Sequence, residues 1–109
     1  MGCVTTTSDA AFDLDVVQDA GPVLVDFYTP TCPPCRQVAP VLEELCNAKQ
    51  GSLKIVKIDA SENPVVASNH QIHVVPTFVL YKAGKLVGQV TGARSKDWFE
   101  NWITTSLAG

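Results

Sequence analysis

Two cysteines separated by two prolines are the residues of this sequence best suited to chemistry. Cys32-Pro33-Pro34-Cys35 follows an apolar run and precedes a segment with helical periodicity, so Cys32 should lie at the amino end of a helix. Partial positive charge and free amide donors at a helix amino end stabilise a thiolate, the species that attacks disulfides. We therefore predict thiol–disulfide exchange, with Cys32 as the attacking thiol and Cys35, one turn later, as the resolving thiol.

The two prolines of the motif adjust this chemistry. Pro33 and Pro34 fix φ through the first turn and remove two amide donors that would otherwise face the Cys32 sulfur. Only the Cys35 amide clearly remains. We therefore predict that the pKa of Cys32 is lowered less than in pairs with a complete donor set, which favours a moderate reductant over a strong oxidant.

The elements that must position this pair follow from the pattern of apolar residues. Residues 23–28 are apolar on both faces except at Asp26, as is typical of a central strand covered by helices. Helical and strand patterns alternate along the chain, which favours an α/β fold with a mixed sheet between helices. We expect other strands at residues 4–7, 53–58, 77–82 and 85–90, the last two joined as a hairpin through Ala83-Gly84.

Four helices are expected, each with a start signal in the sequence. They begin near Ser8 or Asp9, at Pro33, at Asn63-Pro64 and after Ser95. We expect a kink at Pro40 in the long helix that ends near Gly51, and core packing of the last helix through Trp98 and Trp102. The first helix should bury a broad apolar face made of Ala11, Phe12, Leu14, Val16 and Val17.

Composition bounds the class of protein. The 109 residues, 46% of them hydrophobic and 17% charged, favour one globular domain spanning residues 1–109, with a monomer as the default state. A formal net charge of −3 without a basic stripe argues against nucleic-acid binding. No run resembles a secretion signal or a membrane helix, so we expect a cytoplasmic protein without membrane association. The first residues formally match a myristoylation pattern, with Cys3 available for a second acyl chain, but so short a pattern recurs by accident.

The motifs, taken together and in order, resemble the thioredoxin family over residues 12–107. Individually the matches are weak, but together they are highly specific. Besides the cysteine pair, the matching positions are Asp26 (the buried aspartate), Lys57 (its lysine partner), Pro40 (the helix proline), Pro76 (the cis-proline), and Gly84 and Gly92 (the hairpin and groove glycines).

The resemblance implies a thioredoxin-like three-layer α/β/α fold, a protein disulfide reductase activity and a role for several of these positions. Asp26 would accept the proton of Cys35 during resolution, because an apolar strand desolvates the carboxylate and raises its pKa, while Lys57 would restrain that rise. Pro76 would be cis, leaving the Val75 backbone free to pair with an extended substrate. The implied substrate groove comprises Thr31, Pro33, Pro34, Ala60, Val74, Val75, Pro76, Thr91 and Gly92.

The resemblance also implies partners, namely oxidised proteins as substrates and a thioredoxin reductase as electron donor, with the cysteines themselves as the redox group and no added cofactor. Three positions depart from the family pattern: Thr31 and Tyr28 replace tryptophans, and Pro33 replaces a glycine. Loss of a flat apolar side chain beside the nucleophile weakens the expectation of the usual substrates and of a standard reductase.

Other interpretations of the same residues remain open. The cysteine pair could join His70 and His73 in a metal site, but 34 residues separate the two pairs, so we expect no metal and two surface histidines. We expect Cys46 to be a buried free thiol and Cys3 a mobile terminal one, with a regulatory disulfide as the minority interpretation. Functional rivals are a disulfide isomerase or oxidase, and a binding module that does not turn over.

The predicted acidity of Cys32 can be measured directly. Titration of thiolate absorbance in the reduced protein should show Cys32 ionising above about pH 5, because only one amide faces its sulfur. Ionisation below about pH 5 would place the protein among strongly oxidising relatives and refute this interpretation of the two prolines.

Overall fold

The computed structural model describes residues 2–109, and its elements follow the predicted order. A π-helical turn, η1, occupies the place of the first expected helix. Along the chain the elements are β1 (Thr5–Thr6), η1 (Asp13–Val17), β2 (Pro22–Tyr28), α1 (Pro33–Ala48), β3 (Lys54–Asp59), α2 (Pro64–Asn69), β4 (Thr77–Lys82), β5 (Lys85–Thr91) and α3 (Lys96–Ala108).

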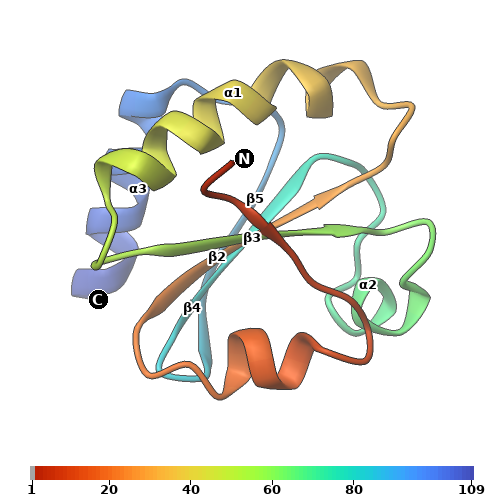
Figure 1. Ribbon diagram of the computed structural model, residues 1–109, viewed down its shortest axis with the longest axis horizontal. Coiled ribbons are helices and arrows are strands. Elements are labelled where there is room, and N and C mark those ends of the chain that lie inside the picture. Colours follow the sequence, from red (N-terminus) through yellow and green to blue (C-terminus); the bar gives the residue numbers. More distant parts are fainter. Residues whose placement is uncertain (1) are drawn as a thin grey trace.

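One mixed five-stranded sheet organises these elements (Figure 1), in the order β1-β3-β2-β4-β5. The first three strands are parallel to one another, while β4 runs antiparallel to both β2 and β5. β2 is therefore the central strand. All but its two terminal residues are buried, as its apolar pattern predicts.

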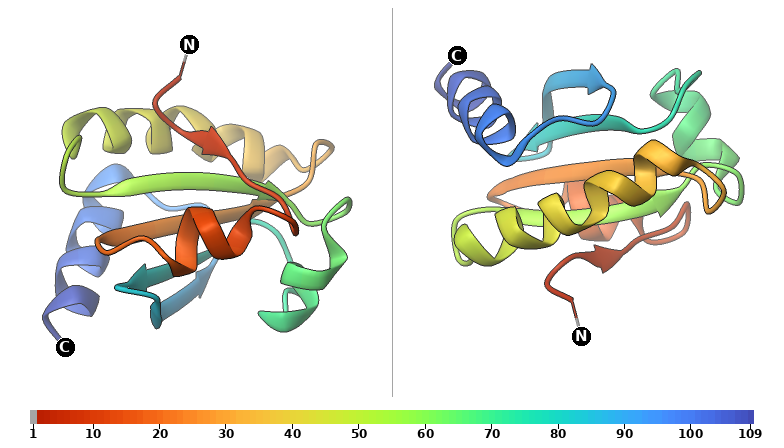
Figure 2. Two further views of the ribbon diagram at one scale, coloured as in Figure 1. Left: turned by 60° about the horizontal axis from the view of Figure 1, so that its bottom comes forward. Right: turned by 90° about the horizontal axis from the view of Figure 1, so that it is seen from above.

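Helices cover both faces of the sheet and create two cores, so the predicted three-layer arrangement is confirmed (Figures 1 and 2). On one face, α1 and α3 pack through residues such as Leu42, Leu45 and Phe99 against Leu24 and Phe78 of the strands. The opposite face carries η1 and α2, whose buried side chains are Phe12, Val16 and Val66, packed against Val23, Val25, Phe27, Val56, Ile58 and Val79.

The segment before β2 differs from the expected helix in two ways. Leu14 was expected on the buried face but is 68% exposed, because the wider π-helical turn directs Phe12 and Val16 inward instead. Asp9 does not cap this turn. Its carboxylate accepts hydrogen bonds from the amides of Val65 (3.1 Å) and Val66 (2.9 Å), so it caps α2 from a distant part of the chain.

Helix α1 is continuous from Pro33 to Ala48 with Pro40 inside it, and Gly51 follows at a φ of 84°. The predicted helix, with Gly51 just beyond its end, is thus confirmed, whereas the kink at Pro40 stays a prediction. The prolines Pro33 and Pro34 occupy the first turn, where a missing amide costs no intrahelical hydrogen bond. The helix therefore begins directly after Cys32.

The hairpin between β4 and β5 confirms the Ala83-Gly84 turn. Both residues have positive φ, 50° and 79°, as a tight two-residue hairpin turn requires. Gly84 also lies against η1, since a Cβ at this position would come within 2.6 Å of the Val17 carbonyl oxygen. Only glycine satisfies both constraints without displacing the backbone.

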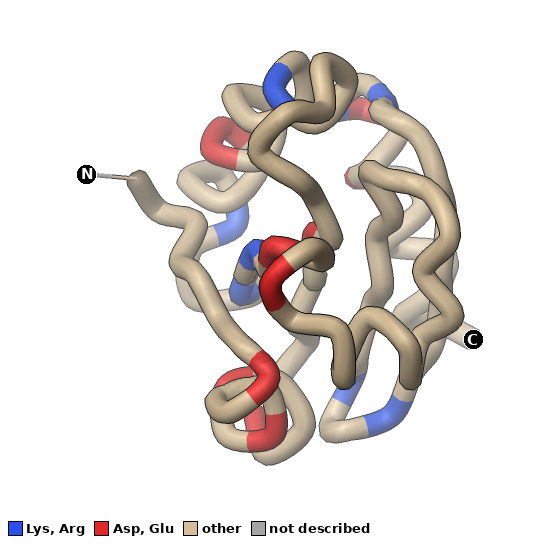
Figure 3. The backbone as a smooth tube through the Cα atoms, turned by 90° about the vertical axis from the view of Figure 1, so that its right-hand side faces the viewer, with Lys and Arg blue, Asp and Glu red and all other residues tan. Residues whose placement is uncertain are grey.

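Charges are spread over the fold. Lys and Arg positions are distributed among several segments of the backbone, while acidic positions recur in and around η1 (Figure 3). Within residues 2–109, no helix is both long and apolar enough to span a membrane.

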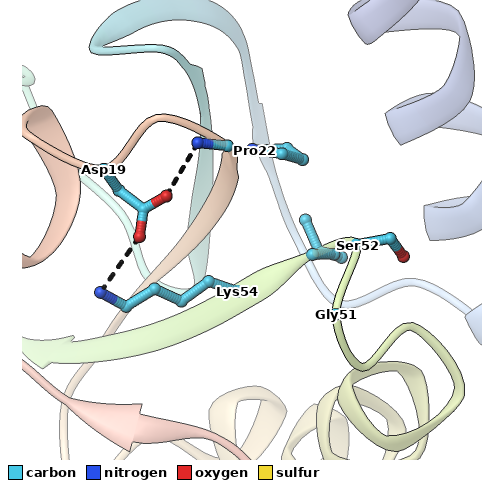
Figure 4. Close-up of a pocket in the computed structure, with 7 residues that line it drawn as sticks. Asp19, Pro22, Gly51, Ser52 and Lys54 are labelled. Atoms are coloured by element: carbon cyan, nitrogen blue, oxygen red, sulfur yellow. Dashed lines mark hydrogen bonds and ion pairs between the residues drawn. The ribbon is translucent and has the colours of Figure 1, made fainter.

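A surface pocket of about 260 Å³ lies at the amino ends of β2 and β3, away from the cysteine motif (Figure 4). In it the Asp19 carboxylate accepts a hydrogen bond from the Gly21 amide (2.8 Å) and pairs with the Lys54 ammonium (3.6 Å). Lys54 also donates to the Asp15 carbonyl (2.6 Å). These contacts tie the η1–β2 connection to β3, which gives the pocket a structural explanation.

The cap of α3 provides a stability test. Ser95 Oγ accepts a hydrogen bond from the Trp98 amide (3.1 Å). Ser95→Ala should lower the free energy of unfolding by about 1 kcal/mol because this amide loses its partner. Ser95→Asp should retain most of the wild-type free energy of unfolding, because its carboxylate can accept the same hydrogen bond. Urea melts measure both, with exposed Thr105→Ala as control. Equal effects of Ser95→Ala and Ser95→Asp would contradict the capping role.

Candidate active site

The junction of β2 and α1 positions the two motif cysteines as predicted. Cys32 is the N-cap of α1, and its Sγ accepts a hydrogen bond from the Cys35 amide (3.2 Å). The two sulfurs form a disulfide with a Cα–Cα distance of 5.2 Å. Both residues are almost fully buried, at 9% and 5% exposure. The single amide contact agrees with the expectation that the two prolines leave only the Cys35 donor.

Arg36 fastens the loop that precedes the nucleophile, a contact that the sequence interpretation missed. Its guanidinium donates two hydrogen bonds to the Pro30 carbonyl oxygen, at 3.1 and 2.7 Å. The Cys32 amide in turn donates to the Thr29 carbonyl (3.3 Å). The loop from β2 to α1 is therefore held from both sides. The sequence did contain one signal for this contact: Arg36 is a cationic side chain near the start of a helix, where the helix dipole disfavours positive charge.

Asp26 and Cys35 line one pocket of about 220 Å³ together with Lys57. The Asp26 side chain is 4% exposed, and within the described chain its Oδ1 has no hydrogen-bond partner. Burial raises the pKa of Asp26 from its ordinary value of 3.8 to about 7, and the charge of Lys57 opposes this rise. Asp26 and Lys57 are register neighbours on β2 and β3, so the sheet itself brings them together.

Tyr28, which stands where the resembling family has tryptophan, closes another side of this pocket. The Lys57 ammonium lies 5.6 Å from the centre of its ring, within cation–π range. Burial raises the pKa of the Tyr28 phenol, and Asp59, Asp26 and Glu62 raise it further. An aromatic face is thus retained despite the substitution, and the Lys57 ammonium lies beside it.

A cis peptide bond joins Val75 to Pro76, as the resemblance implies. The Val75 carbonyl oxygen lies 3.7 Å from Cys32 Sγ. The buried Thr77 hydroxyl donates to the Val74 carbonyl (2.7 Å), and the Gly92 amide donates to the Pro76 carbonyl (2.9 Å). The loop beside the sulfur is therefore anchored to the sheet at both ends.

A shallow pocket of about 260 Å³ runs beside this loop. Three residues expected in the groove, Ala60, Val74 and Val75, line it, and Val74 is 56% exposed. Thr91 and Gly92 adjoin Pro76 through β5, whereas Thr31, Pro33 and Pro34 are exposed around the sulfur pair. Sequence reasoning missed the other residues that line the pocket, which are Thr29, Ser61, Ile72 and His73.

His70 was expected at the surface, and this expectation is wrong. Its ring is half-buried between Phe12, Phe27 and Tyr81, with Nε2 bonded to the Tyr81 hydroxyl (2.7 Å) and Nδ1 to the Val66 carbonyl (2.8 Å). His73 is exposed as expected. Among residues 2–109, no three His, Cys, Asp or Glu side chains gather as metal ligands would.

The expectation of a free Cys46 and a mobile Cys3 is also wrong. The two form a second disulfide with a Cα–Cα distance of 5.9 Å. Cys46 is buried as predicted, but it is bonded to Cys3, a residue 43 positions away that no local pattern places beside it. The minority interpretation was a regulatory disulfide of one of these cysteines; the disulfide is present, whereas its regulatory role stays a prediction.

A redox-active sulfur pair at a helix amino end, beside a cis-proline loop and above a buried carboxylate, is the arrangement of a thiol–disulfide oxidoreductase. The family model described as Thioredoxin matches residues 3–105. Over 96 residues the chain is 44% identical to Thioredoxin from Synechocystis sp., covering 88% of this chain and 90% of the relative.

Two further relatives agree. Thioredoxin 1 from Synechococcus elongatus is 39% identical over 107 residues, or 98% of this chain and all of the relative (100%). Thioredoxin from Mycobacterium tuberculosis is 43% identical over 89 residues, covering 82% and 77%. The chain belongs to the thioredoxin family. It is a protein disulfide reductase that acts by dithiol–disulfide exchange through Cys32 and Cys35.

The buried Asp26 carboxyl predicts how stability depends on pH. Between its ordinary pKa of 3.8 and about 7, the folded protein keeps a proton that the unfolded chain has lost. Ionised Asp26 therefore costs stability as pH rises through this window, and the full cost is reached above it. Asp26→Asn should raise the free energy of unfolding by about 2 to 4 kcal/mol at pH 8 and change it little at pH 4.

Urea melts from pH 4 to pH 9 measure this difference. Exposed Asp97→Asn serves as the control, because its carboxylate faces solvent. An Asp26→Asn effect that is independent of pH would show that Asp26 ionises normally in the fold.

Proposed function

We propose that Cys32 is the nucleophile and Cys35 the resolving thiol of this exchange. The Cys32 thiolate attacks one sulfur of an oxidised substrate, forms a mixed disulfide and releases the other substrate sulfur as a thiolate. Cys35 then attacks Cys32 Sγ, which closes the protein disulfide and frees the second substrate thiol. Two electrons and two protons thereby pass to the substrate. The observation that carries this assignment is the Cys35 amide, which points at Cys32 Sγ from 3.2 Å.

Asp26 is the proton acceptor of the second step in this proposal. Its pKa of about 7 allows it to take the proton of Cys35 near neutral pH, and both residues line the same pocket. Lys57 restrains the rise in that pKa, so that Asp26 is still partly ionised where it must accept a proton. Asp26 and Lys57 would therefore affect the rate of the second step, the attack by Cys35, and not the first attack by Cys32.

The substrate would bind as an extended segment beside the cis-proline. Val75 lies next to Cys32 Sγ and precedes β4, so its backbone can pair with a substrate strand that passes over the sulfurs. Ala60 and Val74 supply one wall of the shallow pocket next to it. Thr91 and Gly92 adjoin Pro76 on the other side, and Thr31, Pro33 and Pro34 complete the proposed surface.

Oxidised proteins are the proposed substrates, and a thioredoxin reductase is the proposed electron donor. Cys32 and Cys35 would be the redox group of this exchange, with no cofactor or metal, and residues 1–109 would work as one monomeric domain. We place this activity in the cytoplasm, where it would carry electrons for cell redox homeostasis. These assignments rest on the family, while Thr31 in place of a tryptophan beside the nucleophile argues for a specialised reductase.

A turnover assay with insulin tests the proposal. Reduction of insulin driven by dithiothreitol should be fast with the wild type and fall at least 100-fold in Cys32→Ser, because the attacking sulfur is gone. Cys3→Ser, which leaves the motif intact, should match the wild type. A parallel assay with NADPH and a flavoprotein reductase reports whether a standard electron donor recognises this surface.

Alternative functions give different results in this assay. Wild-type protein that reduces insulin no faster than dithiothreitol alone would identify a binding module that works without turnover. Oxidation of reduced insulin in preference to its reduction, with a potential well above that of reducing pairs, would identify an oxidase or isomerase.

A further inference from the structure

A second sulfur pair lies at the other end of the helix that carries the active site. Cys3, near the chain start, is bonded to Cys46 in the last turn of α1. Cys46 follows Cys35 by eleven residues on that helix, which corresponds to about 16 Å along its axis. The two pairs are therefore too far apart to exchange directly within one fold.

Glu43 holds the backbone of Cys3 in place for this bond. Its Oε1 accepts hydrogen bonds from the amides of Cys3 (2.6 Å) and Val4 (3.3 Å). Glu43 precedes Cys46 by three residues, so both side chains project from the same face of α1. Gln50 follows the end of the helix, and its side-chain Nε2 lies 3.9 Å from Cys3 Sγ. The two Glu43 contacts are made to backbone amides and do not depend on the sulfur–sulfur bond, so they can present the Cys3 thiol to Cys46 in the reduced protein.

Solvent reaches the two sulfur-bearing residues unequally. Cys46 is 3% exposed and packs in the core between α1, α3 and the sheet, whereas Cys3 is only partly buried. A reagent from solution must therefore react at Cys3. Cys3, which lies beside Glu43 and Gln50, is partly exposed, so small thiols and disulfides can reach it.

The bond anchors an edge strand that has few contacts of its own. β1 contains only Thr5 and Thr6, which pair with Val56 and Lys57 of β3. One further hydrogen bond runs from the Thr7 amide to the Lys57 carbonyl (2.9 Å). So short an edge strand frays readily unless its end is fixed. The disulfide fixes that end at Cys3, two residues before the strand begins.

We propose that Cys3 and Cys46 form a second redox site, a staple that low-molecular-weight disulfides close and low-molecular-weight thiols open, and that its state decides whether β1 stays on the sheet. In closing, the Cys3 thiolate attacks a small disulfide such as oxidised glutathione, forms a mixed disulfide and releases one small thiol. The Cys46 thiolate then attacks Cys3 Sγ and releases the second. One small disulfide is reduced to two thiols as the protein dithiol is oxidised.

The variant Cys32→Ser/Cys35→Ser isolates this pair for measurement. Alkylation with maleimide in denaturant, followed by intact mass spectrometry, should count no free thiol after treatment of the folded protein with oxidised glutathione and two after dithiothreitol. The oxidised form should melt roughly 5 to 15 °C higher, because the closed loop restricts the unfolded chain. Amide hydrogen exchange over residues 2–12 should accelerate at least tenfold on reduction, while α3 stays unchanged.

Two variants control these readouts. Adding Cys3→Ser should abolish the redox dependence of both melting and exchange without disturbing the buried Cys46. In the same Cys32→Ser/Cys35→Ser background, Glu43→Gln should slow closure of the staple several-fold, because the charged acceptor that positions Cys3 is lost. Closure of Cys32–Cys35 in otherwise wild-type protein carrying Glu43→Gln should keep its rate.

Three results would overturn the proposal. These are two thiols that persist at every ratio of oxidised to reduced glutathione, a mixed disulfide on Cys3 that Cys46 never resolves, and equal melting and exchange in the oxidised and reduced forms. None of them bears on Cys32 and Cys35, so the active-site proposal is tested separately.

Discussion

The site depends on how the central strand β2 passes into helix α1. β2 is buried on both faces, which fixes where its carboxyl end emerges, and α1 begins directly after Cys32. The Cys32 sulfur thereby becomes the N-cap and takes the one amide that the two prolines leave free. The backbone therefore fixes the position of the Cys32 sulfur. The Val75 carbonyl then lies beside that sulfur, and Arg36 binds the loop that precedes it.

Near this junction lies Asp26, a buried carboxyl group that lowers the stability of the fold. A carboxylate with an unpaired oxygen in an apolar core destabilises the protein when it ionises, and replacing it would relieve the strain on the core. The presence of such a group beside the cysteine pair supports the proposed role of Asp26 in proton transfer. The parallel pairing of β2 with β3 places Lys57 opposite Asp26. The sheet therefore both buries Asp26, which raises its pKa, and supplies the positive charge that opposes this rise.

The sequence allowed most of this fold to be predicted because its local signals agree with its tertiary structure. The apolar run around Asp26, the prolines after Cys32 and the Ser95 cap each define an element boundary on their own. Contacts between distant segments could not be predicted in this way. Asp9 caps a helix more than fifty residues away, His70 packs in an aromatic cluster, and Cys3 bonds to Cys46. These contacts depend on tertiary packing, which local periodicity does not predict. The π-helical turn likewise redirects Leu14 outward, because its period differs from that of the expected α-helix.

A single trapping measurement addresses the central claim that electrons pass through Cys32 and Cys35 in that order. Reduced Cys35→Ser protein is mixed with an oxidised peptide that carries one disulfide, quenched with acid and mapped by peptide mass spectrometry. The account predicts a stable mixed disulfide between the peptide and Cys32, whereas the wild type should release the reduced peptide and form Cys32–Cys35. A peptide attached to Cys3 or Cys46 instead, or no attached peptide at all, would contradict it.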